Sequence, residues 1–153
     1  MAERSDQLDA VDRQILNLLQ KDARLPFAKI AFEIGVSEAT VRYRIKNLEK
    51  NQIIKCYTTL IDLKKVGFPT TVIMMLKIDP ACFEQVAKQM GDFGEGYHVF
   101  QTTGDFDIVS VVHISDLSRL GELKRRVQII PGVRDVSVSA AIQIIKIKPS
   151  CDL

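Results

Sequence analysis

The chain has 153 residues, of which 46% are hydrophobic, and it carries a net charge of only +2. This length allows one ordinary domain or two small ones with a real core, and so small a charge does not by itself mark a nucleic-acid binder. The absence of an apolar run of about 18 residues argues against a membrane span, and the polar, charged beginning argues against a secretory signal. We therefore expect a cytoplasmic globular protein.

Three short helices are predicted before residue 50. Residues 8–19 carry apolar side chains at the helical period, behind acidic residues that suit a helix N-terminus. Residues 26–34 repeat that period, and the pattern stops at Gly35, which can adopt the left-handed conformation that ends a helix. Ser37 is a plausible N-cap for a third helix. Its inner face consists of Val41, Ile45 and Leu48. The last two helices have the spacing of a helix-turn-helix, whose second helix can enter the DNA major groove.

The outer face of the third helix is basic. From Val41 to Lys55 there are five basic residues against the single acid Glu49. Side chains opposite the inner face are expected to contact bases, and those on its flanks to contact phosphates. The first group consists of Thr40, Tyr43 and Asn47, with Ala39 beside them on the DNA-facing side, and the second of Arg42, Arg44, Lys46 and Lys50, with Ser37 near a phosphate at the helix N-terminus. A merely solvated face is the alternative, but the turn, the cap and the predicted wing favour DNA.

After the third helix the sequence becomes β-like. Residues 53–60 are rich in strand-forming side chains and predict a wing strand that leads out of the helical domain. Glycine and proline interrupt this pattern between residues 63 and 69. We therefore expect a winged helix-turn-helix domain over residues 1–62, a linker over 63–69 and a second domain over 70–153.

The second domain is predicted to follow the order βαββαβ. The strands are expected at residues 71–78, 97–103, 108–114 and 133–147, and the helices at residues 79–90 and 116–130. This is the ferredoxin-like plan, which makes the chain an α+β protein. Both helices of that plan cover one face of the sheet, so the other face should be polar if it meets water. The strands are apolar on both faces instead, which predicts that this face packs on another subunit.

The segment Thr103-Gly104-Asp105-Phe106-Asp107 lies between two predicted strands. Gly-Asp is ordinary hairpin chemistry and by itself requires no ligand. The two histidines, His98 and His113, have no partners at catalytic or metal-ligand spacing, and the three cysteines lack CxxC spacing. The residues therefore predict no catalytic site, no metal site and no cofactor.

Several segments resemble the Lrp/AsnC family of prokaryotic transcription regulators, and together they cover nearly the whole chain. The family's first helix is similar to LDAVDRQILNLLQKDAR, and its recognition helix and wing are similar to VSEATVRYRIKNLEKNQIIKCYTTLID. Its hairpin signature resembles TTGDFDIVSVV, and its final strand resembles PGVRDVSVSAAI. The resemblance implies a DNA-binding first domain. It also implies a second domain that dimerises, assembles into tetramers or octamers, and often binds a small amino acid.

In this family the hairpin lies beside an effector pocket at a subunit interface. An α-amino acid needs an anion near its ammonium group and hydrogen-bond donors near its carboxylate. Asp105 or Asp107 is expected to supply the anion, and backbone amides around Gly104 the donors. Serines on the last strand lie where relatives often carry hydroxyl groups, and they would act from a neighbouring subunit. The expected effector residues are Thr103, Gly104, Asp105, Asp107, Ser137 and Ser139.

The leading hypothesis is a sequence-specific transcription regulator that binds duplex DNA and whose assembly or DNA affinity responds to a small ligand. Two alternatives stay open. The sirohaem decarboxylases share the two-domain layout, but residues 97–102 lack the paired His-Asn-Tyr pattern expected of those enzymes. An architectural protein that wraps DNA with little sequence preference is the other alternative.

Overall fold

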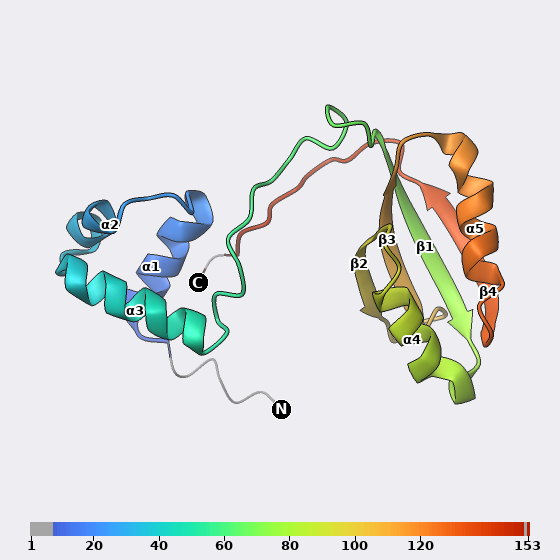
Figure 1. Ribbon diagram of the computed structural model, residues 1–153, viewed down its shortest axis with the longest axis horizontal. Coiled ribbons are helices and arrows are strands. Elements are labelled where there is room, and N and C mark those ends of the chain that lie inside the picture. The colour runs from blue at the N-terminus through green and yellow to red at the C-terminus, as the bar shows by residue number, and fades with distance from the viewer. Residues whose placement is uncertain (1–7, 152) are drawn as a thin grey trace. The chain divides into compact units, whose positions relative to one another are not determined.

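The computed structural model describes residues 8–151 and residue 153 (Figure 1). The chain divides into two compact units. The first contains Met1–Leu60 together with Lys146–Leu153, and the second contains Ile61–Ile145. The residues after Ile145 thus lie with the helices, whereas the sequence analysis assigned them to the second domain. None of the helices in the described part of the chain is long and apolar enough to cross a membrane.

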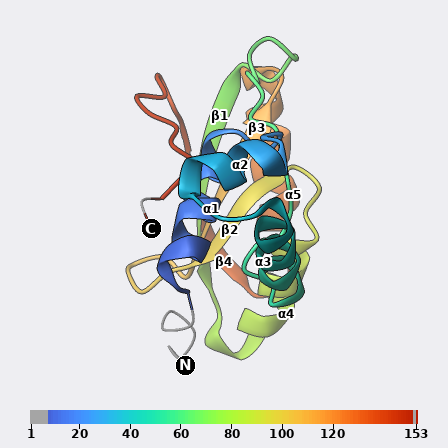
Figure 2. The same ribbon diagram turned by 90° about the vertical axis from the view of Figure 1, so that its left-hand side faces the viewer.

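The first unit contains three helices, α1 (Ala10–Lys21), α2 (Phe27–Ile34) and α3 (Glu38–Lys50), which cross one another around a small core (Figure 2). Local signals set their ends. Gly35 has a φ of 73° and ends α2, and the Ser37 hydroxyl accepts a hydrogen bond from the Thr40 N–H at 3.0 Å. The buried core residues are Ile15, Leu16, Leu19, Ile30, Ala31, Val41, Ile45 and Leu48. The predicted inner face of α3 is therefore confirmed.

The predicted wing strand is not formed. In the described chain between α3 and Thr70 there are turns and irregular backbone but no strand, and residues 55–61 are exposed. A strand needs a neighbouring strand for its backbone hydrogen bonds, and residues 53–60 have none within this one chain. A side-chain contact ties this segment to α3 instead, because the Tyr57 hydroxyl donates to Glu49 Oε1 at 2.8 Å. Partial desolvation of the hydroxyl and this bond to a carboxylate raise the pKa of Tyr57 to about 12.

The second unit is a four-stranded antiparallel sheet with two helices on one face (Figure 1). Its strands are β1 (Thr70–Ile78), β2 (Gly96–Gln101), β3 (Ile108–Ile114) and β4 (Val133–Ala140), in the order β2-β3-β1-β4. Its helices are α4 (Phe83–Gly91) and α5 (Leu120–Gln128), each preceded by a short 3-10 turn. The predicted ferredoxin-like order is confirmed. The last strand is shorter than predicted, because the chain after Ala140 continues beyond the end of the sheet ladder with β1.

Strand register separates a covered face from an open face of the sheet. On β1 and β3, residues facing α4 and α5 are fully buried, among them Met74 and Val112. The alternate residues form the open face, which we define by Thr71, Ile73, Met75, Val109, Val111, His113, Tyr97, His98, Phe100, Ser137 and Ser139. Of its apolar side chains, Ile73 is 37% exposed and Phe100 is 50% exposed. The structure thus has the apolar second face that the sequence predicts.

Candidate nucleic-acid interface and effector hairpin

The outward face of α3 presents four polar side chains that the fold does not use. Tyr43 is 63% exposed, Lys46 and Lys50 are exposed, and Asn47 is half-buried. Within the described residues, none of these four side chains has a hydrogen bond or an ion pair. Tyr43 and Asn47 are separated by one helical turn, so both project from the same side of α3. Ala39, also exposed, precedes them on that side.

The N-terminus of α3 is capped by a local hydroxyl group, that of Ser37. Besides capping the Thr40 N–H, the Ser37 hydroxyl lies 2.8 Å from the Thr40 hydroxyl. Glu38 follows and accepts a hydrogen bond from Arg42 at 2.9 Å. Because Ser37 already bonds two groups of Thr40, its main role in this structure is to start the helix. Its expected contact with a phosphate stays a prediction.

Arg42 and Arg44 both have partners inside the first unit. The Arg42 guanidinium pairs with Glu38 and lies 5.0 Å from the centre of the Phe27 ring on α2. The Arg44 guanidinium lies 2.7 Å from Asp9 Oδ2 and 3.4 Å from Asp12 Oδ2, at the start of α1. Arg44 thus joins α3 to the start of α1. The sequence analysis missed this role, since Asp12 precedes Arg44 by 32 residues.

Asp9 and Asp12 complete this contact from the side of α1. Asp9 caps the helix by accepting the Asp12 N–H at 2.9 Å, and the two residues form a capping box. That hydrogen bond, together with the charge of Arg44, holds the pKa of Asp9 below its ordinary value. Asp12 is buried, with 7% of its surface exposed, so the Arg44 guanidinium neutralises a carboxylate that water hardly reaches.

The hairpin between β2 and β3 uses one of its two aspartates to hold the sheet. Asp107 Oδ2 accepts the Ile78 N–H at 2.7 Å, and the Asp107 N–H donates to the Leu76 carbonyl at 2.8 Å. Asp105 is exposed and has no partner among the described residues. Of the two expected anions, Asp105 is therefore the one that remains available to a ligand.

Gly104 occupies a position where glycine is not needed for conformation or space. Its φ lies outside the left-handed region, and an added Cβ would meet no atom within 4 Å. The ordinary explanation of a hairpin glycine, a positive φ, does not apply here. Thr103 beside it is exposed as well. The tip of the hairpin therefore offers bare backbone to the surroundings.

The structure does not bring Ser137 and Ser139 together with the hairpin in one chain. Both lie on the open face of β4, opposite Met75 and Ile73 of β1. β1 separates β4 from β3, so the serines are two strand spacings, about 10 Å, from the strand that carries the hairpin. A site that joins all six expected residues requires a second copy of the chain.

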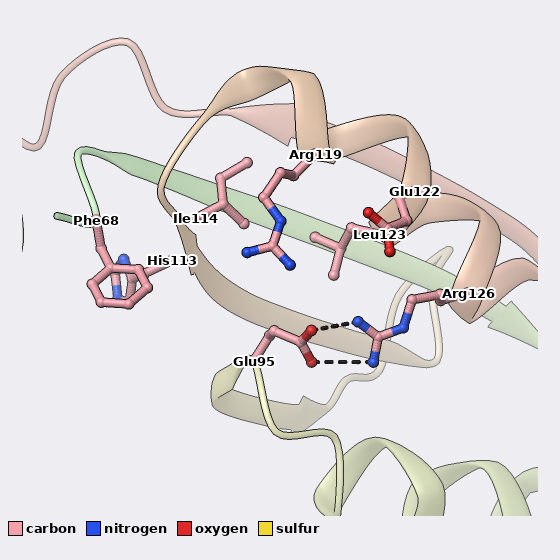
Figure 3. A pocket seen from close by; sticks show the side chains of 8 residues that line it. All are labelled: Phe68, Glu95, His113, Ile114, Arg119, Glu122, Leu123 and Arg126. Carbon is pink, nitrogen blue, oxygen red and sulfur yellow. Dashed lines mark hydrogen bonds and ion pairs between the residues drawn. The ribbon is translucent and has the colours of Figure 1, made fainter.

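A small cavity lies at the other end of β3 (Figure 3). Its volume is about 50 Å³, which is enough for a few water molecules. The lining residues are Phe68, Glu95, His113, Ile114, Arg119, Glu122, Leu123 and Arg126. Arg126 donates to Glu95 across the cavity, and this bond lowers the pKa of the Glu95 carboxyl. The sequence does not predict this cavity, because its walls come from four separate segments.

Comparison with known families matches both units. Residues 8–49 match the AsnC-type helix-turn-helix domain, and residues 71–151 match the Lrp/AsnC ligand binding domain. The second match alone covers more than half of the chain. The chain belongs to the Lrp/AsnC family of transcription regulators. This family consists of DNA-binding regulators, so the chain is not an enzyme and the sirohaem decarboxylase alternative falls away.

Individual relatives of this Lrp/AsnC regulator agree along its length. The HTH-type transcriptional regulator Ptr1 of Methanocaldococcus jannaschii is 32% identical over 140 residues, covering 91% of this chain and 95% of Ptr1. The structure of an AsnC family transcriptional regulator from Agrobacterium tumefaciens is 26% identical, covers 94% of this chain and 96% of its own, and has a TM-score of 0.86. Regulator NMB0573 of Neisseria meningitidis, solved as an L-Met complex, shares the fold at 23% identity, 94% and 96% coverage and a TM-score of 0.87.

Proposed function

We propose that this Lrp/AsnC regulator binds specific sites on duplex DNA through α3, as a dimer or a larger assembly of dimers in the cytoplasm. We further propose that a small amino acid bound at the hairpin of residues 103–107 modulates its assembly or its DNA affinity. The observation that carries the first proposal is the set of four unpartnered side chains on the outward face of α3. No enzyme cofactor has a part in this function.

These four side chains have complementary chemistry toward DNA. Asn47 can pair with the edge of an adenine, and Tyr43 can contact base edges or thymine methyl groups. Lys46 and Lys50 lie beside them as exposed cations suited to phosphates. Arg42 can also reach a phosphate if it leaves Glu38, since an exposed pair of this kind is weak. Arg44 contributes less directly, because its charge is already neutralised by Asp9 and Asp12.

The open face supports the proposed dimer. Apolar side chains from β1, β2 and β3 are gathered there without any cover from α4 or α5. A surface of this kind is rarely left exposed on a monomer, and most homo-oligomers are two-fold dimers. The dimer would place two recognition helices on one DNA duplex. It would also let the serines of one copy approach the hairpin of another.

The effector proposal rests on the hairpin tip and on the ligand binding domain of the family. Asp105 supplies an unpaired carboxylate for an ammonium group, and the bare backbone at Gly104 supplies donors for a carboxylate. Because NMB0573 was solved with L-methionine, methionine belongs among the candidates. Isothermal titration of the protein with each of the common amino acids tests this proposal. If an amino acid binds and Asp105→Asn weakens that binding, the proposed site at the hairpin is supported. If no amino acid gives a heat of binding, the effector proposal is contradicted.

Footprinting on the promoter region of its own gene tests the DNA proposal. We expect protection of a defined site, whereas an architectural protein would protect DNA without preference. Lys46→Gln should lower the slope of log affinity against log salt by about one, because one phosphate contact is lost. Lys124→Gln on α5 is the matched control and should leave the slope unchanged. Asn47→Ala should relax the preference at one base pair; unchanged binding in both α3 variants would disprove the interface.

Sedimentation equilibrium tests the proposed dimer. Ile73→Asp puts a charge on the centre of the open face, and we expect it to yield monomers because a buried unpaired charge is unfavourable. Ile129→Asp is the matched control, since Ile129 is 75% exposed after α5 and lies off the open face. If Ile73→Asp assembles like the unaltered protein, the dimer uses another surface.

A further inference from the structure

The chain passes between its two units twice. It leaves the first unit after Leu60, forms the sheet, and returns after Ile145. We call residues 146–153 the return segment. Neither the family comparison nor the sequence pattern gives this segment a role with the helices. Hydrogen bonds join Cys151 and Leu153 of this segment to α1.

Two side chains of α1 bind the return segment as a neighbouring strand would. Gln20 Nε2 donates to the Cys151 carbonyl oxygen at 3.0 Å, and Gln20 Oε1 accepts the Cys151 N–H at 2.8 Å. Asn17 repeats this pattern with the backbone of Leu153, where both distances are 3.4 Å. A side-chain amide offers one donor edge and one acceptor, as a peptide group does. Four hydrogen bonds therefore hold two backbone positions of the return segment.

The spacing of the two pairs matches the periods of the two partners. Asn17 and Gln20 are three residues apart, so they lie on one face of α1. Residues 151 and 153 are two apart in the sequence, which is the period of an extended chain. The opposite face of α1 carries Ile15 and Leu19 into the core. On the polar face of α1, the spacing of Asn17 and Gln20 thus matches the spacing of the two backbone positions that they bind.

We propose that α1 is a docking site for the return segment, and that this docking couples the sheet unit to the DNA-binding helices. The route is continuous through bonded elements. β4 carries Ser137 and Ser139 on the open face and leads through residues 141–145 into the return segment. The return segment is bonded to Gln20 on α1, and α1 is joined to the recognition helix by Arg44.

The bonds that hold the return segment suit a reversible contact. The two bonds of Gln20 join neutral groups at the surface, and such hydrogen bonds each contribute little to stability. A change at β4, through pairing of sheets or a ligand at the open face, can therefore release or tighten the segment. Such a change at β4 then acts on α1 through the return segment, in addition to the linker before β1. The effect on DNA rests on the proposed function, but the docking itself does not.

Engineered disulfide formation tests the docking. Cys151 is native, and its Sγ lies 3.6 Å from Gln20 Oε1. In a background with Cys56→Ser and Cys82→Ser, we expect Gln20→Cys to form an intrachain disulfide with Cys151 under mild oxidation, while the Asn17 contact is kept. Gln14→Cys, two turns earlier on α1, is the matched control and should stay reduced. Equal oxidation of the two variants, or disulfides only between chains, would overturn the docking.

The same variant tests the coupling. DNA affinity is compared between the oxidised and the reduced Gln20→Cys protein on a footprinted site, with Gln14→Cys treated identically. Locking the segment should change the affinity by about fivefold or more, the lower end of usual coupling strengths. An unchanged affinity in the locked protein would overturn the coupling. If no form binds DNA, the proposed interface fails, and the disulfide result still decides the docking.

Discussion

Arg44 lies on α3, yet its guanidinium group contacts Asp9 and Asp12 of α1. The exposed pair with Asp9 is screened by water and contributes little. The contact with Asp12 matters more, because this carboxylate is buried and needs a partner. On the same helix, Lys46 and Lys50 have no such partner among the residues that the structure describes. Arg44 of α3 thus stabilises the helical unit, whereas Lys46 and Lys50 remain available to DNA.

We expect Arg44→Ala to lower the free energy of unfolding of the helical unit by about 1–3 kcal/mol, because the buried Asp12 loses its cation. Urea unfolding followed by circular dichroism measures this loss. Lys46→Ala is the matched control on α3 and should not change stability. Adding Asp12→Asn to Arg44→Ala should restore part of the loss, since no buried charge is then left without a partner. A stable Arg44→Ala variant with weakened DNA binding would instead assign Arg44 directly to DNA.

Asp9 makes the stability of the helical unit depend on acid pH. Its pKa is held below the ordinary 3.8 by the Asp12 N–H and then by Arg44, so the unfolded chain binds its proton more readily. The stabilisation is therefore present above about pH 4 and is lost as pH falls through the lowered pKa. Asp9→Asn keeps a good N-cap without the charge, and it should flatten the acid side of a pH–stability profile. An unchanged profile would contradict this role.

At the scale of elements, the sequence predicts those helix ends that are set by residues close to them in the chain. The caps at Ser37 and Gly35 act within a few residues, so the helices of the first unit were predicted with nearly correct ends. The prediction of a wing strand was wrong because β pairing needs a partner strand that the local sequence does not contain. The Asn17 and Gln20 contacts join residues more than 130 positions apart, and no period or motif indicates them. The outward face of α3 was predictable, as was the spacing of Arg42 and Glu38, but the partners of Arg44 on α1 were not.

The turn from α5 into β4 depends on a glycine that packing enforces. Gly132 has a φ of 95°, and an added Cβ would collide with the Cβ of Cys82. We expect Gly132→Ala to destabilise the sheet unit by more than the roughly 1–2 kcal/mol cost of left-handed backbone alone. Thermal unfolding measures the effect. Gly121→Ala on α5, where an added Cβ has open space, is the control and should not destabilise the unit.

At the scale of the whole molecule, both histidines of the chain lie on the open face. The Tyr97 ring is 4.4 Å from the His98 ring and 4.9 Å from the His113 ring, centre to centre. His113 Nδ1 is 3.1 Å from the Thr71 hydroxyl. Partial burial, and then the nearby charge of His98, lower the pKa of His113. Glu95 and Arg119 also border the cavity that His113 lines.

Assembly through the open face should therefore weaken in mild acid. The pKa of His113 is below 6.5 in the folded chain, so the unfolded chain binds this proton more readily. The folded state is therefore fully stable above about pH 6.5 and loses stability as the pH falls toward the lowered pKa. Pairing two copies would bury His113 further and would place two more imidazoles at the same interface, which steepens the decline. Sedimentation equilibrium at pH 7.5 and pH 5.5 should show a larger dissociation constant at the lower pH. His113→Gln keeps a polar side chain that cannot take up this charge, and it should remove most of that difference; an equal pH dependence in the variant would place the titrating group elsewhere.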